Sequence, residues 1–149
     1  MKKNWLFALI SSLLVLALAA CGGGEGDGAA SGDAPSTNSV EGTVNMYVDG
    51  IDKENTDTVL KSLHPFSSQH VTLRGFYDND FAQFDYDVEV VSLEVVEESD
   101  SSAVVKLVMN KTLVEEKAEG KNELKEGEIT QTLTLKTKGD EWLIDKVEE

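Results

Sequence analysis

The chain contains one cysteine, Cys21, among 149 residues, so no disulfide bond can form within it. A single cysteine in an exported chain therefore needs an explanation other than a disulfide. Basic residues are also scarce: 13 lysines and arginines accompany 28 acidic residues, and the formal net charge is −15. Because a surface of this sign repels nucleic-acid phosphates and anionic lipid headgroups, neither is expected as a direct partner.

Long apolar runs are absent except near the N-terminus. Residues 5–18 are apolar apart from two serines, and they follow Lys2 and Lys3. A membrane-spanning helix needs about 20 apolar residues, and this run is shorter and leads into glycines. A basic start, a short apolar run and small residues together are typical of a secretory signal peptide, which we predict for residues 1–20.

The residues around the cysteine make this prediction more specific. Leu18-Ala19-Ala20-Cys21-Gly22 resembles the bacterial lipobox, in which the cysteine thiol receives diacylglycerol before the signal peptide is removed. The alternative is an ordinary secretory signal that ends at a chance cysteine. Lipidation of Cys21 would explain the single thiol, and two or more acyl chains hold a protein stably on a membrane. We therefore expect a lipid-anchored protein on the extracytoplasmic side of a bacterial cell membrane.

The next segment has almost nothing to bury. Residues 22–38 contain no large apolar side chain and are rich in glycine. Such a sequence cannot bury enough surface to offset the entropy of ordering, so residues 21–38 are predicted to be the lipidated cysteine and a flexible tether. The remaining residues, 39–149, are sufficient for one domain.

Helical patterns come first in this domain. Ser39 is expected to cap a helix over about 40–51, where apolar residues recur at helical spacing. The pair Asn55-Thr56 can supply the cap of a second helix, which ends before Pro65 because the residue preceding a proline is disfavoured in the α region. The segment 67–83 is expected to be mostly helical.

Strand patterns follow. Valines alternate with acidic residues until the alternation changes parity between Val90 and Val91, which indicates a β-bulge that bends the strand. A second strand is predicted to carry an inward row over 103–109. A third is predicted over 129–135, and a fourth after the turn at Gly139-Asp140.

This order of elements resembles the nuclear-transport-factor-2-like superfamily, whose fold is the cystatin-like cone. The resemblance rests on the helical segments 44–52 and 57–65, the bent strand, the strand at 103–107 and the closing Gly139-Asp140-Glu141-Trp142-Leu143-Ile144, and it covers about residues 40–148. It implies an α+β fold in which N-terminal helices pack on a bent four-stranded antiparallel sheet. It also implies that the tryptophan of the closing segment packs under the sheet.

The resemblance leaves the function open. Some members of the superfamily are enzymes on small molecules, such as ketosteroid isomerases, scytalone dehydratases and polyketide cyclases, and many others are binding, targeting or assembly modules. A fold alone does not decide between these classes.

An isomerase-type site would need a general base beside a hydrogen-bond donor in an apolar pocket. Tyr47, Tyr77 and Tyr86 are candidate donors. The candidate bases are five aspartates: Asp49, Asp78, Asp80, Asp85 and Asp87. Acidic residues are so abundant that a tyrosine with an aspartate neighbour is expected by chance, and helix capping and solvation explain these aspartates as well. The sequence therefore indicates no catalytic residue.

Metal-binding patterns are weak. His64 and His70 are six positions apart around a proline, whereas two ligands on one helix face would be three or four apart. Asp78-Asn79-Asp80 lacks the glycine that an EF-type calcium loop needs at its sixth position. The sequence therefore indicates neither a metal site nor a cofactor.

Aromatic residues are dense between positions 66 and 86. Most are expected to be ordinary core that seals the concave sheet. A sharper interpretation is that some line an incompletely filled cone, which accepts an apolar ligand or a partner peptide. The candidate lining residues are Tyr47, Phe76, Tyr77, Phe81, Tyr86, Met109 and Trp142.

We therefore expect a membrane-anchored, extracytoplasmic binding or interaction module of the cell envelope without enzymatic activity. Its partner would be an unknown envelope protein or a small apolar ligand, and a homodimer through the sheet face is one arrangement. The alternative is a cone-fold enzyme of the isomerase or dehydratase type. A third hypothesis is an accessory domain of the kind found ahead of cell-wall transpeptidases. A buried acid beside a tyrosine in an open cavity would favour the enzyme.

Overall fold

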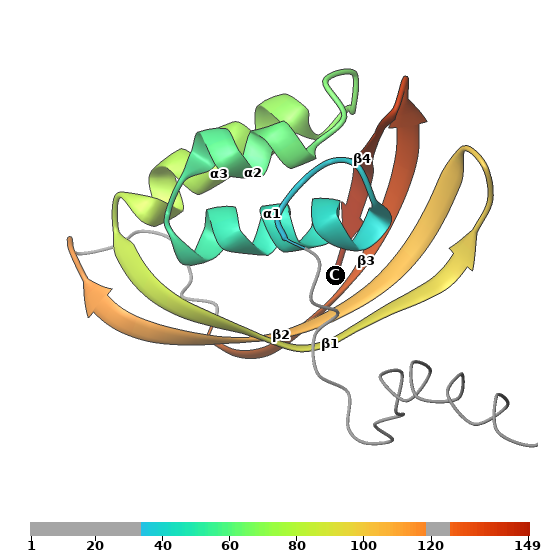
Figure 1. The fold of residues 1–149 in the computed structure, drawn as a ribbon. Helices are drawn as coiled ribbons and strands as arrows, with labels where there is room; N and C mark the ends of the chain where they lie inside the picture. Colours follow the sequence, from blue (N-terminus) through green and yellow to red (C-terminus); the bar gives the residue numbers. More distant parts are fainter. Residues whose placement is uncertain (1–33, 119–125) are drawn as a thin grey trace, which may run out of the picture.

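The computed structural model describes residues 34–118 and 126–149. Its helices are α1 (Val40–Asp52), α2 (Thr56–Ser62) and α3 (His70–Phe81), and its strands are β1 (Phe84–Glu98), β2 (Ser102–Glu116), β3 (Gly127–Lys138) and β4 (Glu141–Glu148). The strands pair antiparallel in the order β1-β2-β3-β4, and the three helices lie on the concave face of the curved sheet (Figure 1). The α+β cone predicted from the sequence is confirmed. Cys21 and the expected signal peptide lie outside the described residues.

Side chains cap the first two helices at the predicted positions. The Ser39 Oγ accepts a hydrogen bond of 3.0 Å from the backbone N–H three residues later, and Asn55 Oδ1 accepts one of 2.9 Å in the same way. Between the caps, a side chain at Gly50 would place its Cβ 2.6 Å from the backbone nitrogen of Val59. Glycine is therefore what allows α1 and α2 to pack so closely.

The third helix packs less tightly than the first two. It begins at His70, three residues later than expected, and Gln69 at its N-cap makes no capping hydrogen bond with its side chain. Val71 in its first turn is 81% exposed. The three buried residues of α3 are Tyr77, Asp80 and Phe81.

The late start of α3 has a tertiary cause at the outer edge of β4. The Ser67 hydroxyl donates a hydrogen bond of 2.6 Å to the carbonyl oxygen of Asp145. The Gln69 side-chain amide accepts a bond of 2.7 Å from the Val147 N–H and donates one of 3.0 Å to its carbonyl oxygen. This amide therefore pairs with β4 as a neighbouring strand would, and it covers part of an edge that could otherwise pair with another chain.

The predicted bulge in β1 is confirmed. Val90 pairs with Met109 and Ser92 with Val108, so Val91 has no partner in β2. Two further register shifts, one toward each end of the strand, have no clear signal in the alternation of the sequence. Because a bulge bends its strand and increases the local twist, β1 curves around the helices.

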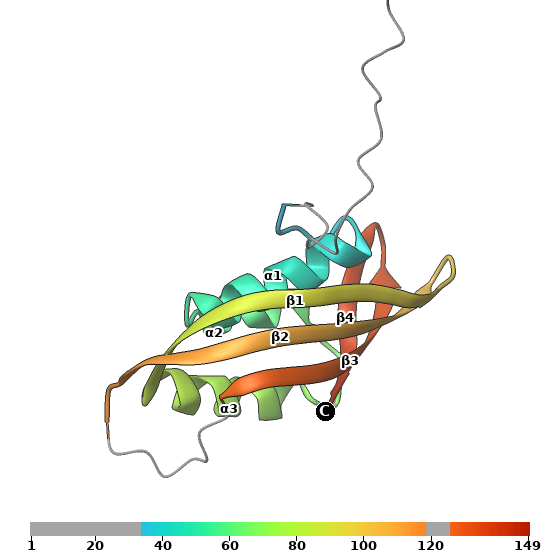
Figure 2. The same cartoon turned by 90° about the horizontal axis from the view of Figure 1, so that it is seen from below.

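The first described residues pack against the turn between β3 and β4. The Trp142 N–H donates a hydrogen bond of 2.7 Å to the carbonyl oxygen of Thr37, and the Thr37 hydroxyl donates one of 2.9 Å to Glu141 Oε1. Contacts with the domain therefore already occur within the range 21–38 that the sequence predicts as the tether. In Figure 2 this end of the domain lies opposite the C-terminus.

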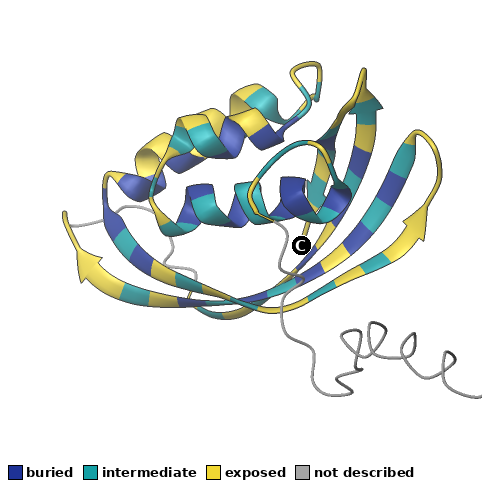
Figure 3. Ribbon diagram, in the orientation of Figure 1, coloured by how far each residue is buried: buried dark blue, intermediate teal, exposed yellow. Residues whose placement is uncertain are grey.

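The core lies between the helices and the concave face of the sheet, where buried positions form stripes along α1 and the strands (Figure 3). The predicted inward row of β2 is confirmed, because its members are all buried: Ala103, Val105, Leu107 and Met109. Within residues 34–118 and 126–149, no helix has the length and apolar character needed to cross a bilayer.

Candidate functional site

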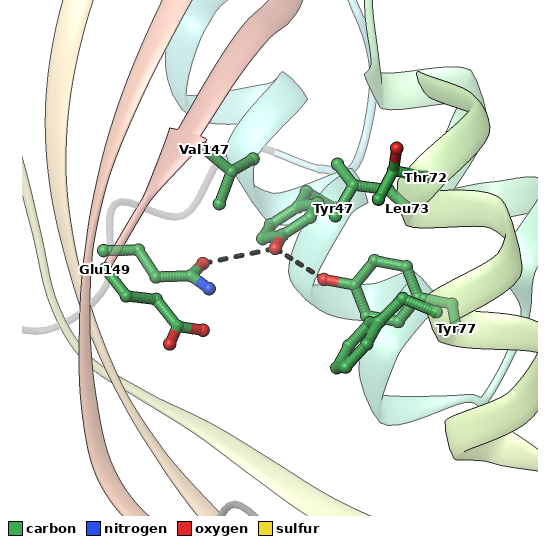
Figure 4. A pocket seen from close by; sticks show the side chains of 8 residues that line it. Tyr47, Thr72, Leu73, Tyr77, Val147 and Glu149 are labelled. Carbon is green, nitrogen blue, oxygen red and sulfur yellow. Dashed lines mark hydrogen bonds between the residues drawn. The ribbon is translucent and has the colours of Figure 1, made fainter. Parts of the chain in front are cut away.

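A cavity of about 360 Å³ lies between α3 and the concave face of the sheet (Figure 4). It is lined by Tyr47, Thr72, Leu73, Phe76, Tyr77, Gln131, Val147 and Glu149. A second void of about 30 Å³ shares four of these residues with the cavity, so the two spaces are neighbours: Phe76, Tyr77, Gln131 and Glu149. The larger space lies within the usual range of small-molecule sites, about 300–1,000 Å³.

A chain of three buried polar groups crosses this cavity. The Tyr47 and Tyr77 hydroxyls are 2.7 Å apart, and Tyr47 donates a hydrogen bond of 3.2 Å to Gln131 Oε1. Figure 4 shows the two tyrosine hydroxyls turned toward each other from α1 and α3. Their rings meet edge to face, with centroids 6.4 Å apart. This geometry is a favoured one for aromatic pairs, so packing and hydrogen bonding fix the two side chains together.

Burial determines the ionisation of the two tyrosines. Desolvation raises the pKa of Tyr47 to about 12, even though its hydrogen bonds with Tyr77 and Gln131 lower it. Desolvation also raises the pKa of Tyr77 well above its usual value, and the neighbouring Tyr47 adds to this increase. Both phenols therefore keep their protons across the physiological range and act as neutral hydrogen-bonding groups.

Gln131 is a residue that the sequence analysis missed. It occupies an inward position of β3, two residues before Leu133, and is 5% exposed. Its signal in the sequence is the alternation of the strand: positions 129, 131, 133 and 135 form one row, and only position 131 is polar. An isolated polar side chain in an otherwise apolar row needs a partner, which Tyr47 provides.

A second polar cluster lies beside the smaller void. Lys111 Nζ is 3.2 Å from Asp80 Oδ2, and the two side chains are only 7% and 4% exposed. The same nitrogen lies 3.5 Å from the centroid of the Tyr86 ring. Lys111 was also missed by the sequence analysis, although alternation with Met109 places it on the inner face.

The Tyr86 hydroxyl is buried and makes no hydrogen bond with the described residues. Desolvation raises the pKa of this phenol, and the negative charge of Asp80 raises it further. Tyr86 therefore remains a neutral ring that supports the Lys111 ammonium through a cation–π contact.

The seven candidate pocket residues lie in different places. Tyr47, Phe76 and Tyr77 line the larger cavity, and Met109 lines the smaller void. The other three candidates line neither space: Phe81, Tyr86 and Trp142. Phe81 packs in the core with its ring 5.2 Å from that of Tyr77, Tyr86 lies under Lys111, and Trp142 is half-buried near the first described residues.

The candidate bases lie outside the cavity lining. Asp80 is buried near Tyr86 but paired with Lys111, and the other candidate aspartates do not border either space. Glu149, at the exposed rim, is the acidic side chain that borders both. The His64 ring is tilted against that of Phe66 with centroids 5.8 Å apart, and the described part of the chain holds no cluster of three metal-ligating side chains.

Solved structures of other proteins share this architecture. A nuclear transport factor 2 (NTF2-like) superfamily protein from Salmonella enterica serovar Typhimurium matches 71% of this chain and 83% of its own, with 16% identity and a TM-score of 0.53. A candidate scytalone dehydratase from Novosphingobium aromaticivorans matches 73% of this chain and 78% of its own, with 11% identity and a TM-score of 0.57. A candidate aromatic ring hydroxylase from the same organism matches 72% and 82%, with 16% identity and a TM-score of 0.55. At these identities the likeness shows the fold alone.

No curated protein matches the chain. Residues 43–149, which include nearly all of the described domain, match the family model of the C-terminal domain of the anti-sigma-I factor RsgI9. The chain therefore belongs to the family of the anti-sigma-I factor RsgI9 C-terminal domain, and its domain has the nuclear-transport-factor-2-like fold.

Proposed function

We propose that this chain is a lipid-anchored, extracytoplasmic binding module whose cavity under α3 takes a small and mostly apolar molecule. The cavity of about 360 Å³ carries this proposal, because its apolar wall contains one ordered set of hydrogen-bonding groups. That combination is typical of sites that bind a small molecule in a fixed orientation.

The electrostatics of the cavity favour binding over catalysis. Tyr47 and Tyr77 bond to each other and keep their protons up to high pH, so neither is poised to exchange a proton near neutrality. Asp80, the buried acid near a tyrosine, is compensated by Lys111. General acid–base catalysis is most effective with groups whose pKa values lie near the working pH.

The anchoring part of the proposal rests on the lipobox-like residues around Cys21 and on the placement of the domain's two ends. The chain joins the domain at Thr37, beside the turn between β3 and β4. Val147 and Glu149, which line the cavity, lie at the other end of β4. A domain tethered through Thr37 would turn the cavity end away from the membrane. The family is named for a regulatory factor, which favours a binding role.

Ligand entry is tested by titrating the chain with 2-ethylnaphthalene and following the methyl resonances of Leu73 and Val147 by NMR. We expect saturable shifts at both residues. In Leu73→Trp, where the Leu73 methyl groups are gone, the Val147 shifts should disappear because the larger ring fills the cavity. The matched control is Val71→Trp, which places the same ring on an exposed position of the same helix. Shifts that do not saturate, or that persist in Leu73→Trp, would contradict the binding role.

Anchoring is tested separately by mass spectrometry of the mature N-terminus. We expect a chain that begins at Cys21 and carries diacylglycerol, and Cys21→Ser should release the protein from the membrane fraction. An unmodified N-terminus at any other residue would rule out the lipid anchor and leave the cavity binding untouched.

One observation favours a second candidate function, that of an enzyme on a small apolar substrate. The Glu149 carboxylate and the Tyr77 hydroxyl border the same cavity, and a carboxylate beside a phenol is a combination used for proton abstraction next to a carbonyl. This activity would exchange the methyl protons of 2-acetylnaphthalene in deuterated water, and Glu149→Gln would abolish the exchange. A binding module leaves the exchange rate at its uncatalysed value.

A further inference from the structure

The orientation of one buried amide defines the polarity of the cavity. Gln131 is only 5% exposed, and it lines both the cavity and the smaller void. Its Oε1 accepts a hydrogen bond from Tyr47. The side-chain nitrogen of the same amide, Nε2, carries two protons that this bond does not use.

The order of protons along the chain of polar groups follows from the number of hydrogens. The Tyr47 hydroxyl has one proton, and it is donated to Gln131 Oε1. The 2.7 Å contact between the two phenols must then be a bond in which Tyr77 donates to Tyr47. Every proton in the chain therefore points toward Gln131, and the chain ends at the Nε2 donors of that residue.

The Nε2 group borders open space. No described residue accepts a hydrogen bond from it, and it is not among the polar atoms sealed from solvent without a partner. Water can serve as its acceptor while the cavity is empty. A ligand that displaces this water must supply an acceptor of its own, because a buried donor left without a partner costs about 1–3 kcal/mol.

The charged groups around the cavity restrict the kind of acceptor. Glu149 lines both spaces and contributes a negative charge, which raises the pKa values of Tyr47 and Tyr77. Lys111 is paired with Asp80 and borders the smaller void but not the larger cavity. A carboxylate ligand in the larger cavity would therefore meet the negative charge of Glu149 and no lysine or arginine among the described lining residues.

We infer that the cavity selects uncharged ligands that present a carbonyl-type oxygen to Gln131 Nε2 on an apolar, ring-bearing body. This inference rests on the proposed binding function, and it specifies the chemical class of the ligand. The apolar part would pack against Leu73, Phe76 and the ring of Tyr77, and the oxygen would take the place of a water molecule at the end of the polar chain.

The test compares three molecules of nearly the same shape: 2-acetylnaphthalene, 2-ethylnaphthalene and 2-naphthoate. Binding of each to the chain is measured by NMR titration. We expect the ketone to bind about three- to tenfold more tightly than the hydrocarbon, as one net hydrogen bond would give, and the carboxylate to bind more weakly than the ketone. In Gln131→Met the ketone should lose its advantage while the hydrocarbon still binds. The matched control is Thr132→Met, an exposed position on the outer face of the same strand.

The outcomes separate the inference from the function on which it rests. If none of the three molecules produces saturable shifts at the cavity, both the binding function and the inference fail. If the ketone and hydrocarbon bind equally, or if 2-naphthoate binds most tightly, the binding function stands and the inference is overturned. The wild-type comparison decides the question even if Gln131→Met does not fold.

Discussion

Near the turn between β3 and β4, the concave face of the sheet is filled by aliphatic side chains under α1, whereas under α3 it holds tyrosines, a buried ion pair and a cavity. The filled end contains fully buried residues such as Val44, Val105 and Leu135. The end beneath α3 contains the Tyr47–Tyr77–Gln131 chain and the space of about 360 Å³. The two ends share one sheet but have different interiors.

The change from aliphatic to polar inward side chains occurs in the same direction along three elements: β2, β3 and α1. The inner row of β2 runs from Val105 through Leu107 to Met109 and Lys111, and that of β3 runs from Leu135 through Leu133 to Gln131. On α1, Val44 is followed by Tyr47. Because β2 and β3 are antiparallel, both rows become polar toward the same end of the sheet: Gln131 lies opposite Leu107, and Lys111 lies four residues farther along, opposite Gly127. The filled end contributes most of the hydrophobic stabilisation, and the other end exchanges part of it for polar groups and space.

The largest expected effect comes from breaking the buried ion pair under α3. Lys111→Met should lower the free energy of unfolding by about 3–5 kcal/mol, because it leaves the Asp80 carboxylate buried without its cation. Urea denaturation followed by circular dichroism measures this change. The double variant Asp80→Leu/Lys111→Met removes both charges and should recover most of the loss. If the double variant is as unstable as the single one, the charge of Asp80 is not the cause.

A smaller effect per residue is expected at alkaline pH, where the tyrosines of the polar end ionise. The pKa of Tyr47 is about 12 in the folded chain and about 10 when unfolded, so between these values the unfolded chain loses its proton first. The contribution of the neutral, buried Tyr47 to the free energy of unfolding is therefore complete below pH 10, and it is lost as the pH rises to 12. The loss from Tyr47 alone is about 3 kcal/mol, and Tyr77 and Tyr86 add to it in the same direction.

Urea unfolding between pH 9 and 12, with phenolate absorbance recorded in parallel, measures this dependence. We expect phenolate to form together with loss of the fold, and Tyr47→Phe should make the stability less dependent on pH. Phenolate that forms near pH 10 while the circular dichroism stays native would show that the tyrosines are accessible to water.

Features of the fold that depend on local sequence could be predicted. Ser39 and Asn55 are capping residues followed by helical patterns, the parity change at Val91 is a property of one strand, and Gly139 has the positive φ of 65° expected in a tight turn. The start of α3 could not be predicted in this way. The segment before it bonds to β4 through Gln69, about 78 residues distant in sequence, and that contact competes with continuation of the helix.

The site was predicted less completely than the fold. Aromatic density pointed to Phe76 and Tyr77, which line the cavity, but also to Phe81, which packs in the core. Gln131 and Lys111 were missed because polar residues in a strand are normally read as solvent-facing, although the alternation of each strand places them inside. Which inward position becomes core and which borders a cavity depends on how closely α3 approaches the sheet, and no local pattern encodes that distance.

The comparison between the two ends can be sharpened with matched leucine truncations. Leu135→Ala at the filled end should destabilise the chain by about 3 kcal/mol, since it opens a cavity among fully buried neighbours. Leu73→Ala at the other end should cost about 1 kcal/mol, because this half-buried side chain already borders open space. Urea denaturation of both variants should therefore give a difference of about 2 kcal/mol. Equal losses would mean that the polar end is packed as tightly as the filled end.

The smallest effect is expected where the polar end meets the edge of β4. Gln69→Ala removes both hydrogen bonds to Val147, and it should lower the free energy of unfolding by about 1 kcal/mol because water can replace much of the lost bonding at this partly exposed site. Val147 lines the cavity. In Gln69→Ala its amide loses its acceptor, so it should exchange with deuterium faster than amides at the filled end, such as that of Leu135. Gln69→Glu keeps the acceptor but loses the donor, so its free energy of unfolding should lie between those of the wild type and Gln69→Ala. If Gln69→Ala accelerates exchange equally at both ends, the two halves of the cone open as one unit and the Gln69 amide does not protect the cavity side on its own.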